Sequence, residues 1–196
     1  MGYVKDWGFS LDELDEIVEA HPSLRGMIQG YLAEYAFRKH WLNNEKRISD
    51  IKRWDNHDRN KKGDVTFTYK GVEIITEVKS LQSNMVKQTG PDTFEGKTQC
   101  DASDSREIEL SNGDVLKTTC LRVGEFDVLA VNLFEFGKKW RFAFAVNDEL
   151  PRSKYRKYTP EQRDLLLATL MEVTWPPEPP FEADLFAALD KIVKSK

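Results

Sequence analysis

The sequence has few cysteines and no pattern that would tie them to a metal. Only Cys100 and Cys120 occur among 196 residues, and no C-x-x-C pair is present. The three histidines, His21, His40 and His57, are scattered along the chain. We therefore expect no structural zinc site, and we expect a protein of the reducing cytoplasm rather than one stabilised by disulfides.

Long apolar runs are also missing. No window approaches the roughly 18 consecutive apolar residues that a membrane-spanning helix needs. The N-terminal stretch MGYVKDWGFSLDELDE is acidic and has no apolar core, so it does not have the pattern of a signal peptide. These absences predict a protein that does not associate with a membrane.

The chain has no excess of positive charge. It contains 29 Lys and Arg against 33 Asp and Glu, which gives a net charge of −4 and excludes a globally basic nucleic-acid binder. A basic face on one side remains compatible with this balance. Hydrophobic residues make up 40% of the chain, enough for one sizeable core, and the length predicts a single domain over 1–196.

Two helices are predicted at the start of the chain. The sequence SLDE has the spacing of a capping box and predicts a helix over about 10–20. After a break, apolar residues at helical spacing predict a second helix over about 24–42, capped by Ser23. Gly26 and Gly30 lie four residues apart on this helix, and we expect them to allow close packing against another element.

Strands dominate the middle of the chain. We predict strands over about 48–54, 64–69, 72–79, 97–103, 106–116, 127–136 and 140–146. We predict a loop over 80–96, a short helix or turn over 115–126, and helices over about 159–171 and 182–193. This order indicates an α/β or α+β fold with a central mixed sheet flanked by helices, a core over about 24–146 and a C-terminal helical extension over about 151–196.

Three charged residues interrupt the apolar hairpin over 64–79. Asp64 opens its first strand, and Glu77 and Lys79 lie two apart on the second strand, so they share one face. Such a pair either stabilises a solvated face or forms part of a site. Mg²⁺ prefers one or two carboxylates and keeps several waters, and a fixed cation offsets charge that develops on a phosphate during hydrolysis.

The motif resembles that of a known family. Gly63-Asp64, twelve intervening residues and then Glu77-Val78-Lys79 are similar to the D…(D/E)-x-K site of the PD-(D/E)XK, or restriction-endonuclease-like, nucleases. The resemblance implies a restriction-endonuclease-like core. It also implies that Asp64, Glu77 and the Val78 carbonyl bind Mg²⁺ or Mn²⁺ and that Lys79 activates or positions the attacking water. The proline that precedes the aspartate in the family is replaced by Gly63.

Two further residues are candidates by the same resemblance. Many members carry a glutamate on the first core helix, and Glu34 is in that position; it is otherwise a surface residue on the helix flank. Some subfamilies have a glutamine after the motif, and Gln99 is a candidate, with an ordinary strand glutamine as the alternative.

Basic residues gather in two segments. Residues 38–62 hold nine Lys and Arg and lead into Asp64, and PRSKYRKY mixes cations with tyrosines. Counter-ion release favours contact between such runs and DNA phosphates, although the second segment is equally compatible with a solvated loop. The predicted DNA contacts are Arg59, Lys61, Lys62, Arg152, Lys154 and Arg156. The acidic helix over 10–20 would repel DNA, so we expect it to face away or to meet a protein partner.

Three functions are compatible with these features. The first is a Mg²⁺-dependent DNA endonuclease, for which the family implies a role in restriction or defence. The second is a nuclease-like module that binds nucleic acid or protein without cutting. The third is a structural α+β protein in which Glu77 and Lys79 form an ion pair. Cutting both strands of a duplex needs two sites, which favours a homodimer.

Overall fold

The computed structural model describes residues 2–53 and 63–196. The helical elements are α1 Tyr3–Asp6, α2 Leu11–Ala20, α3 Pro22–Phe37, the π-helix η1 Arg38–Leu42, the 3₁₀ turns η2 Ser83–Met85 and η3 Asn147–Glu149, α4 Pro160–Asp164 and α5 Leu185–Ser195. The strands are β1 Ile48–Arg53, β2 Val65–Tyr69, β3 Val72–Ser80, β4 Lys87–Gly90, β5 Thr93–Gln99, β6 Asp101–Glu109, β7 Val115–Cys120, β8 Val128–Asn132, β9 Phe142–Val146 and β10 Leu170–Trp175.

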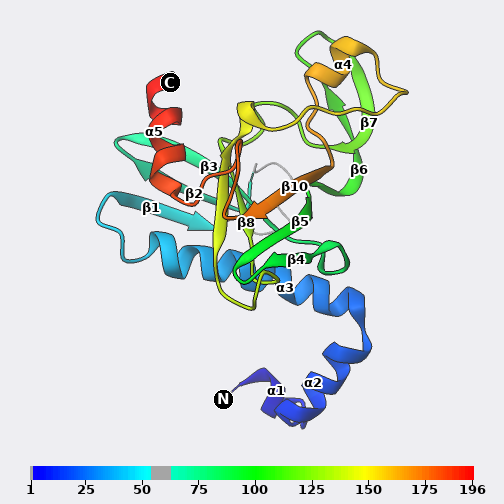
Figure 1. Cartoon of the computed structure of the whole chain (residues 1–196), viewed down its shortest axis with the longest axis vertical. Helices are drawn as coiled ribbons and strands as arrows, with labels where there is room; N and C mark the ends of the chain where they lie inside the picture. Colours follow the sequence, from blue (N-terminus) through cyan, green and yellow to red (C-terminus); the bar gives the residue numbers. More distant parts are fainter. Residues whose placement is uncertain (1, 54–62) are drawn as a thin grey trace.

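A five-stranded mixed sheet forms the centre of the fold, in the order β1-β2-β3-β8-β9 (Figure 1). The β3–β8 pair is parallel, and the other neighbours are antiparallel. Every residue of β8 is buried, because this strand is covered on both faces. The predicted mixed α+β architecture, with flanking helices and a C-terminal helix, is confirmed.

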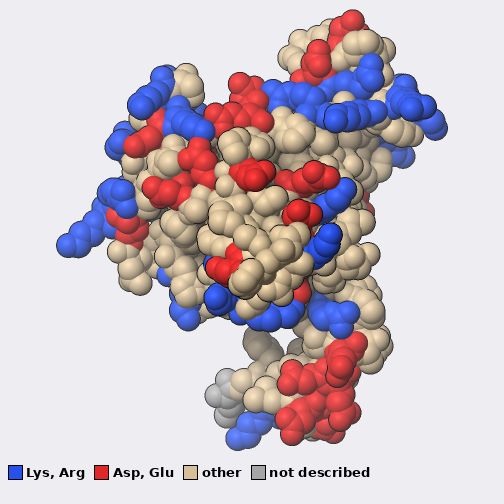
Figure 2. Space-filling model, in the orientation of Figure 1, with Lys and Arg blue, Asp and Glu red and all other residues tan. Residues whose placement is uncertain are grey.

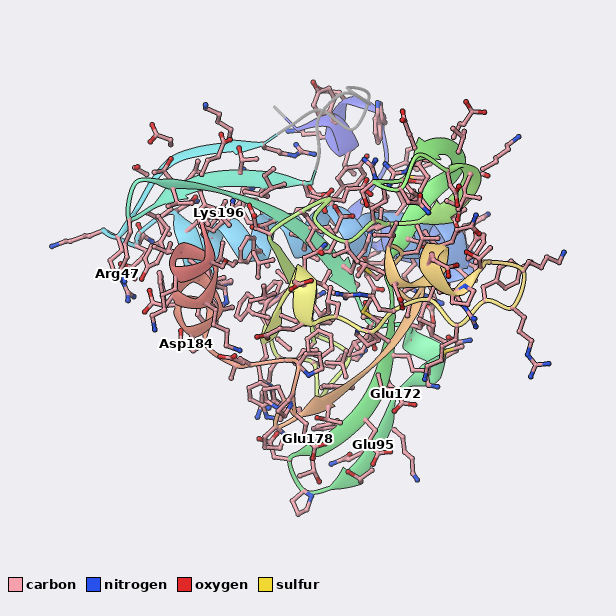
Figure 3. The ribbon with its side chains drawn as sticks, turned by 90° about the horizontal axis from the view of Figure 1, so that it is seen from above. Arg47, Glu95, Glu172, Glu178, Asp184 and Lys196 are labelled. Atoms are coloured by element: carbon pink, nitrogen blue, oxygen red, sulfur yellow. The ribbon has the colours of Figure 1, made fainter. Side chains whose placement is uncertain are left out.

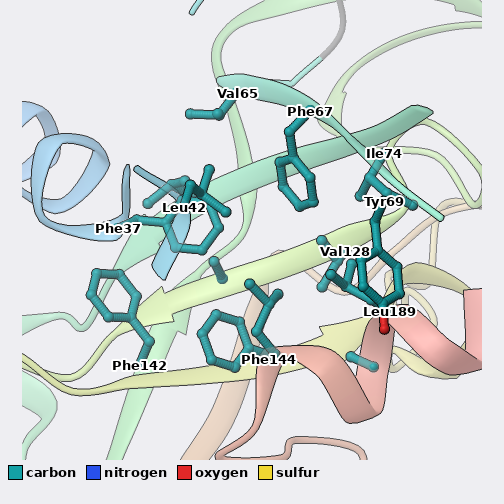
Figure 4. Packing of buried hydrophobic residues seen from close by; sticks show 14 of the residues in the cluster. Phe37, Leu42, Val65, Phe67, Tyr69, Ile74, Val128, Phe142, Phe144 and Leu189 are labelled. Atoms are coloured by element: carbon teal, nitrogen blue, oxygen red, sulfur yellow. The ribbon is translucent and has the colours of Figure 1, made fainter. Parts of the chain in front are cut away.

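Helices α3 and α5 cover one face of this sheet. The core between them contains Phe37, Phe67, Tyr69, Phe142 and Phe144 together with smaller aliphatic side chains (Figure 4). Ile74 and Val78 of β3 point into this core, as the two-residue period of a strand requires. The intervening residues of β3, among them Glu77 and Lys79, therefore face the other side of the sheet.

A second, three-stranded sheet packs on that other side, in the order β10-β5-β4. Leu129, Val131, Phe94 and Met171 belong to the apolar cluster between the two sheets. The outward face of the second sheet is polar. Figure 3 shows Glu95 of β5 and Glu172 of β10 on neighbouring strands away from α5. The hairpin β6–β7 forms a separate two-stranded sheet.

Strongly patterned elements match the sequence predictions. The Ser10–Glu13 capping box at the start of α2 is present, and β1, β2, β3, the β8–β9 hairpin and α5 occur where they were expected. No helix in the described part of the chain is long and apolar enough to cross a membrane.

Weakly patterned elements were predicted wrongly. The predicted loop over 80–96 contains β4 and most of β5, whose inward positions include a glycine and a threonine that give little hydrophobic signal. The segment 115–126 begins with strand β7 rather than a helix or turn. The predicted helix over 159–171 ends at Asp164, and the following residues enter β10, which pairs with β5.

The cap of the second helix also differs from the prediction. Pro22 occupies the first turn of α3, so the N-cap is His21 rather than Ser23, and no side chain caps this end. Proline is favoured there because its missing N–H would have no helical partner in any case.

Gly63 has a positive φ of +71°, and a Cβ at this position would lie 2.6 Å from Cγ2 of Ile75 and 2.8 Å from the Thr76 carbonyl oxygen. Proline, whose φ is fixed near −65°, cannot adopt this conformation. We predict that Gly63→Ala lowers the free energy of unfolding by about 2 kcal/mol or more, because strain and clash add.

Gly71→Ala is the matched control, since Gly71 has φ +78° but open space around it. The free energy of unfolding of Gly71→Ala should fall by only about 1–2 kcal/mol, which is the cost of placing a residue with a Cβ atom in the left-handed conformation. Urea denaturation of the two variants measures the difference, and equal losses would contradict the role of the Gly63 contacts.

Candidate active site

A cavity of 460 Å³ lies between α3, the end of β3 and the β5–β6 connection. Its wall includes four of the five predicted catalytic residues, namely Glu34, Asp64, Lys79 and Gln99, together with Val78. Residues predicted to act together therefore come from four different elements to one cavity.

Asp64 is fixed by the start of the β2–β3 pairing. Its backbone N–H donates to the Thr76 carbonyl at 2.9 Å, and its Oδ2 accepts a hydrogen bond from the Val78 N–H at 2.7 Å. The paired register ends at Val65 opposite Thr76. The hydrogen bond from the Val78 N–H holds the Asp64 carboxylate beside the end of β3, where Glu77 and Lys79 lie.

Glu77 and Lys79 form an ion pair, with 2.7 Å between Oε1 and Nζ. The side chain of Glu77 is 12% exposed and that of Lys79 is 24% exposed. Burial opposes the charged form of Lys79, but the negative charges of Glu77 and Asp64 outweigh it and raise the Lys79 pKa. Lys79 therefore stays protonated and supplies a permanent positive charge.

Burial, reinforced by the charge of Glu77, raises the pKa of Asp64 to about 8. The attraction of Lys79 and the hydrogen bond from Val78 act in the opposite direction and do not compensate. The Asp64 carboxylate is thus buried beside the charge of Glu77, an arrangement that a bound divalent cation would stabilise. Glu77 itself does not belong to the cavity wall.

Glu34 lies on the buried side of α3 and is 9% exposed. The alternative of a surface position is therefore wrong. Its Oε2 is 3.4 Å from Nε of Arg53 at the end of β1. Burial raises the Glu34 pKa against the lowering effect of Arg53 and Arg38, and the charge of Glu77 adds to the rise, which places Glu34 within electrostatic reach of the pair on β3.

Gln99 and Asp101 line the cavity from the β5–β6 connection. The Gln99 side-chain amide donates to both carboxylate oxygens of Asp101 at 3.1 Å. Sequence reasoning did not identify Asp101, although its position two residues after Gln99 was the available signal.

Gly26 and Gly30 do not have the packing role that we predicted. A Cβ at either position would meet nothing within 4 Å, and both residues line the cavity. The smooth stripe of α3 therefore faces open space beside the candidate site instead of another element.

The predicted DNA contacts lie away from the cavity wall or outside the described residues. Arg59, Lys61 and Lys62 belong to the segment that the structure does not describe. Arg152 donates to Asp148 at 3.0 Å and to the Leu150 carbonyl, so it holds its own loop together. Lys154 and Arg156 are exposed, and Figure 2 shows Lys and Arg gathered over the end of the molecule that carries α4.

The donor set fits Mg²⁺ better than a metal that needs many protein ligands. Within residues 2–53 and 63–196, no group of three or more His, Cys, Asp or Glu is arranged to hold a metal. Asp64 and Glu77 provide two hard oxygen donors, which matches an ion that binds one or two carboxylates and retains water.

Comparisons with known proteins give little further information. No protein-family model matches the chain, and no curated protein matches it. Among solved structures, the bacterial homing endonuclease I-Ssp6803I is similar with a TM-score of 0.39 and 16% identity, over 71% of this chain and 87% of that chain. At this TM-score and identity, the likeness establishes neither a shared family nor an activity.

The raised pKa of Asp64 predicts how stability depends on pH without metal. A raised pKa in the folded state gives a contribution that is complete below the unfolded pKa near 4 and is lost as pH rises towards about 8. Asp64→Asn should therefore increase the melting temperature relative to wild type at pH 8, and the difference should shrink towards pH 4. A difference in melting temperature that is the same at pH 4 and at pH 8 would contradict the raised pKa of Asp64.

Proposed function

We propose that this protein is a Mg²⁺-dependent phosphodiesterase that cleaves DNA. The observation that carries the proposal is the convergence of Asp64, Glu77 and Lys79 at one end of the β2–β3 pair, beside a cavity that Glu34 also lines. Two carboxylates and a permanently charged lysine on rigid strands meet the needs of phosphodiester hydrolysis.

Each residue has a definite role in the proposal. The carboxylates of Asp64 and Glu77 hold the divalent ion, with the Val78 carbonyl as a further oxygen donor. When bound, a divalent metal polarises the phosphate and lowers the pKa of a coordinated water. Lys79 keeps its proton, orients the attacking water and offsets the charge of the transition state. Glu34 and Gln99 contact waters or substrate at the cavity wall.

DNA is the proposed substrate on grounds of charge. The cavity itself contains little positive charge, so the duplex backbone would be held by the basic runs outside it, including Lys154 and Arg156. Both cysteines are free and buried, which agrees with action in a reducing cytoplasm. Restriction or defence is the biological role that the family resemblance suggests.

One observation favours a second candidate, a module that binds nucleic acid without cutting it. Glu77 and Lys79 already neutralise each other at 2.7 Å, so the pair is balanced without a metal. Salt-dependent DNA binding with no cleavage in Mg²⁺ or Mn²⁺ would support this candidate over the first.

A cleavage assay tests the proposed activity. Plasmid and linear DNA incubated with Mg²⁺ or Mn²⁺ should be cut by the wild type. Asp64→Asn, Glu77→Gln and Lys79→Ala should each lose at least about 100-fold in rate, because the first two remove a ligand of the divalent ion and the third removes the positive charge that stabilises the transition state.

The matched controls are Glu73→Gln at the exposed start of the same strand and Lys97→Ala on β5. Both side chains lie outside the cavity wall, and both variants should retain the wild-type rate. Cleavage that survives in Asp64→Asn and Lys79→Ala would exclude the proposed site.

A further inference from the structure

Helix α3 is apolar on two opposite sides. Its inner side enters the core through Ala33, Ala36 and Phe37. Its outer side is exposed to solvent, with relative exposures of 62% for Met27, 46% for Tyr31, 45% for Leu32 and 56% for Tyr35. A helix that is apolar all round is normally buried on all sides. We therefore expect another protein surface to cover the outer side of α3.

The segment before α3 has the same property. None of the residues in α1 and α2 that the structure describes is buried, and Figure 1 shows these helices projecting from the body as an arm. Large apolar side chains of this arm are exposed, namely Tyr3, Trp7, Phe9, Leu11 and Ile17. Together with α3, residues 3–35 hold nine of the fourteen large exposed apolar side chains of the described chain.

Helix α2 is amphipathic, so only its apolar side is expected to contact another protein surface. Leu11, Leu14, Ile17 and Val18 lie on one side at helical spacing, and the five acidic residues of the helix occupy the other. The arm and the outer side of α3 thus carry more large exposed apolar side chains than the isolated ones that are normal on a protein surface.

The charged residues near the exposed apolar side chains indicate what kind of molecule binds there. Acidic residues gather on the arm (Figure 2), whereas the opposite end of α3 continues into the basic residues Arg38, Lys39 and His40. Acidic charge repels a polyanion, so DNA does not fit the arm. The two ends of the segment from α2 to η1 carry opposite charge, and a two-fold axis across α3 would place each acidic arm beside the basic end of the other copy.

We infer that a second copy of this chain covers the arm and the outer side of α3, forming an isologous helical interface. Stable interfaces use about 20 to 30 residues on each side, and the segment 3–39 is long enough to supply them. Five residues of this segment line the cavity and are not counted on, namely Pro22, Gly26, Gln29, Gly30 and Glu34. The inference does not depend on the proposed phosphodiesterase activity, because it rests on the exposed apolar residues of the arm and of α3, which lie outside the cavity wall.

Sedimentation velocity over a concentration series tests the interface. We expect the wild type to be a dimer at low micromolar concentration. Ile17→Glu and Tyr35→Glu should each raise the dimer dissociation constant by about 100-fold, because a two-fold axis places every substitution in the interface twice. Val115→Glu, at an equally exposed apolar residue in β7, should leave the dimer unchanged. Unaltered circular dichroism spectra will show that the variants remain folded.

Charge reversal tests how the two copies are aligned in the dimer. Asp15→Lys with Glu19→Lys, and separately Arg38→Glu with Lys39→Glu, should each weaken the homodimer, and mixing the two variants should restore one pair of matched contacts in a heterodimer. A wild type that stays monomeric at tens of micromolar, or a dimer that Ile17→Glu and Tyr35→Glu leave intact, would overturn the inference. Homodimers of both charge variants as stable as the wild type would overturn the paired-charge arrangement.

Discussion

The register between β2 and β3 determines whether a site exists at all. One pair of hydrogen bonds fixes it where the strands meet, from the Asp64 N–H to Thr76 and from the Val78 N–H back to the Asp64 carboxylate. A slip of one residue would turn Glu77 and Lys79 towards the α3 core and expose Val78 instead. Gly63 permits the tight approach to this register, since no other residue fits its conformation without strain.

That register places charge where a structural sheet would place aliphatic side chains. Three carboxylates, Glu34, Asp64 and Glu77, lie near the cations Lys79, Arg53 and Arg38. Burial, with the charge of Glu77, still raises the pKa of Asp64, and this destabilises the metal-free protein at neutral pH relative to acidic pH. Buried charges with shifted pKa values are common at functional sites. A divalent ion bound by the two carboxylates would offset their negative charge.

The sequence predicted the parts of the fold in which local pattern and tertiary environment agree. The β8–β9 hairpin and α5 have strong apolar periodicity, and the central sheet followed from them. Strand β4 and the first part of β5 were missed because the inward positions of β5 include Gly96 and Thr98, which give little hydrophobic signal. Strand β10 was missed because pairing with the distant β5 decides its conformation. The helix predicted over 159–171 failed for the same reason, since long-range bridges from Leu166 and Leu167 override local helix propensity.

The sequence predicted the part of the candidate site that lies on one hairpin, but not the part that depends on packing between elements. The spacing of Asp64, Glu77 and Lys79 along a hairpin fixes their neighbourhood from strand geometry alone. The pairing of Glu34 with Arg53 and the position of Asp101 depend on how three separate elements pack, which no local pattern encodes. The glycines of α3 show the same limit, because their spacing suggested packing and their surroundings are open space.

The central claim is that Asp64 and Glu77 together bind a divalent metal. Anomalous diffraction from crystals of the protein grown with Mn²⁺ at pH 8 tests it most directly, with Asp64→Asn crystals for comparison. The account predicts one strong peak between the two carboxylates in the wild type and its loss in the variant. An empty space there, with Glu77 still paired to Lys79 and Mn²⁺ bound elsewhere, would contradict it.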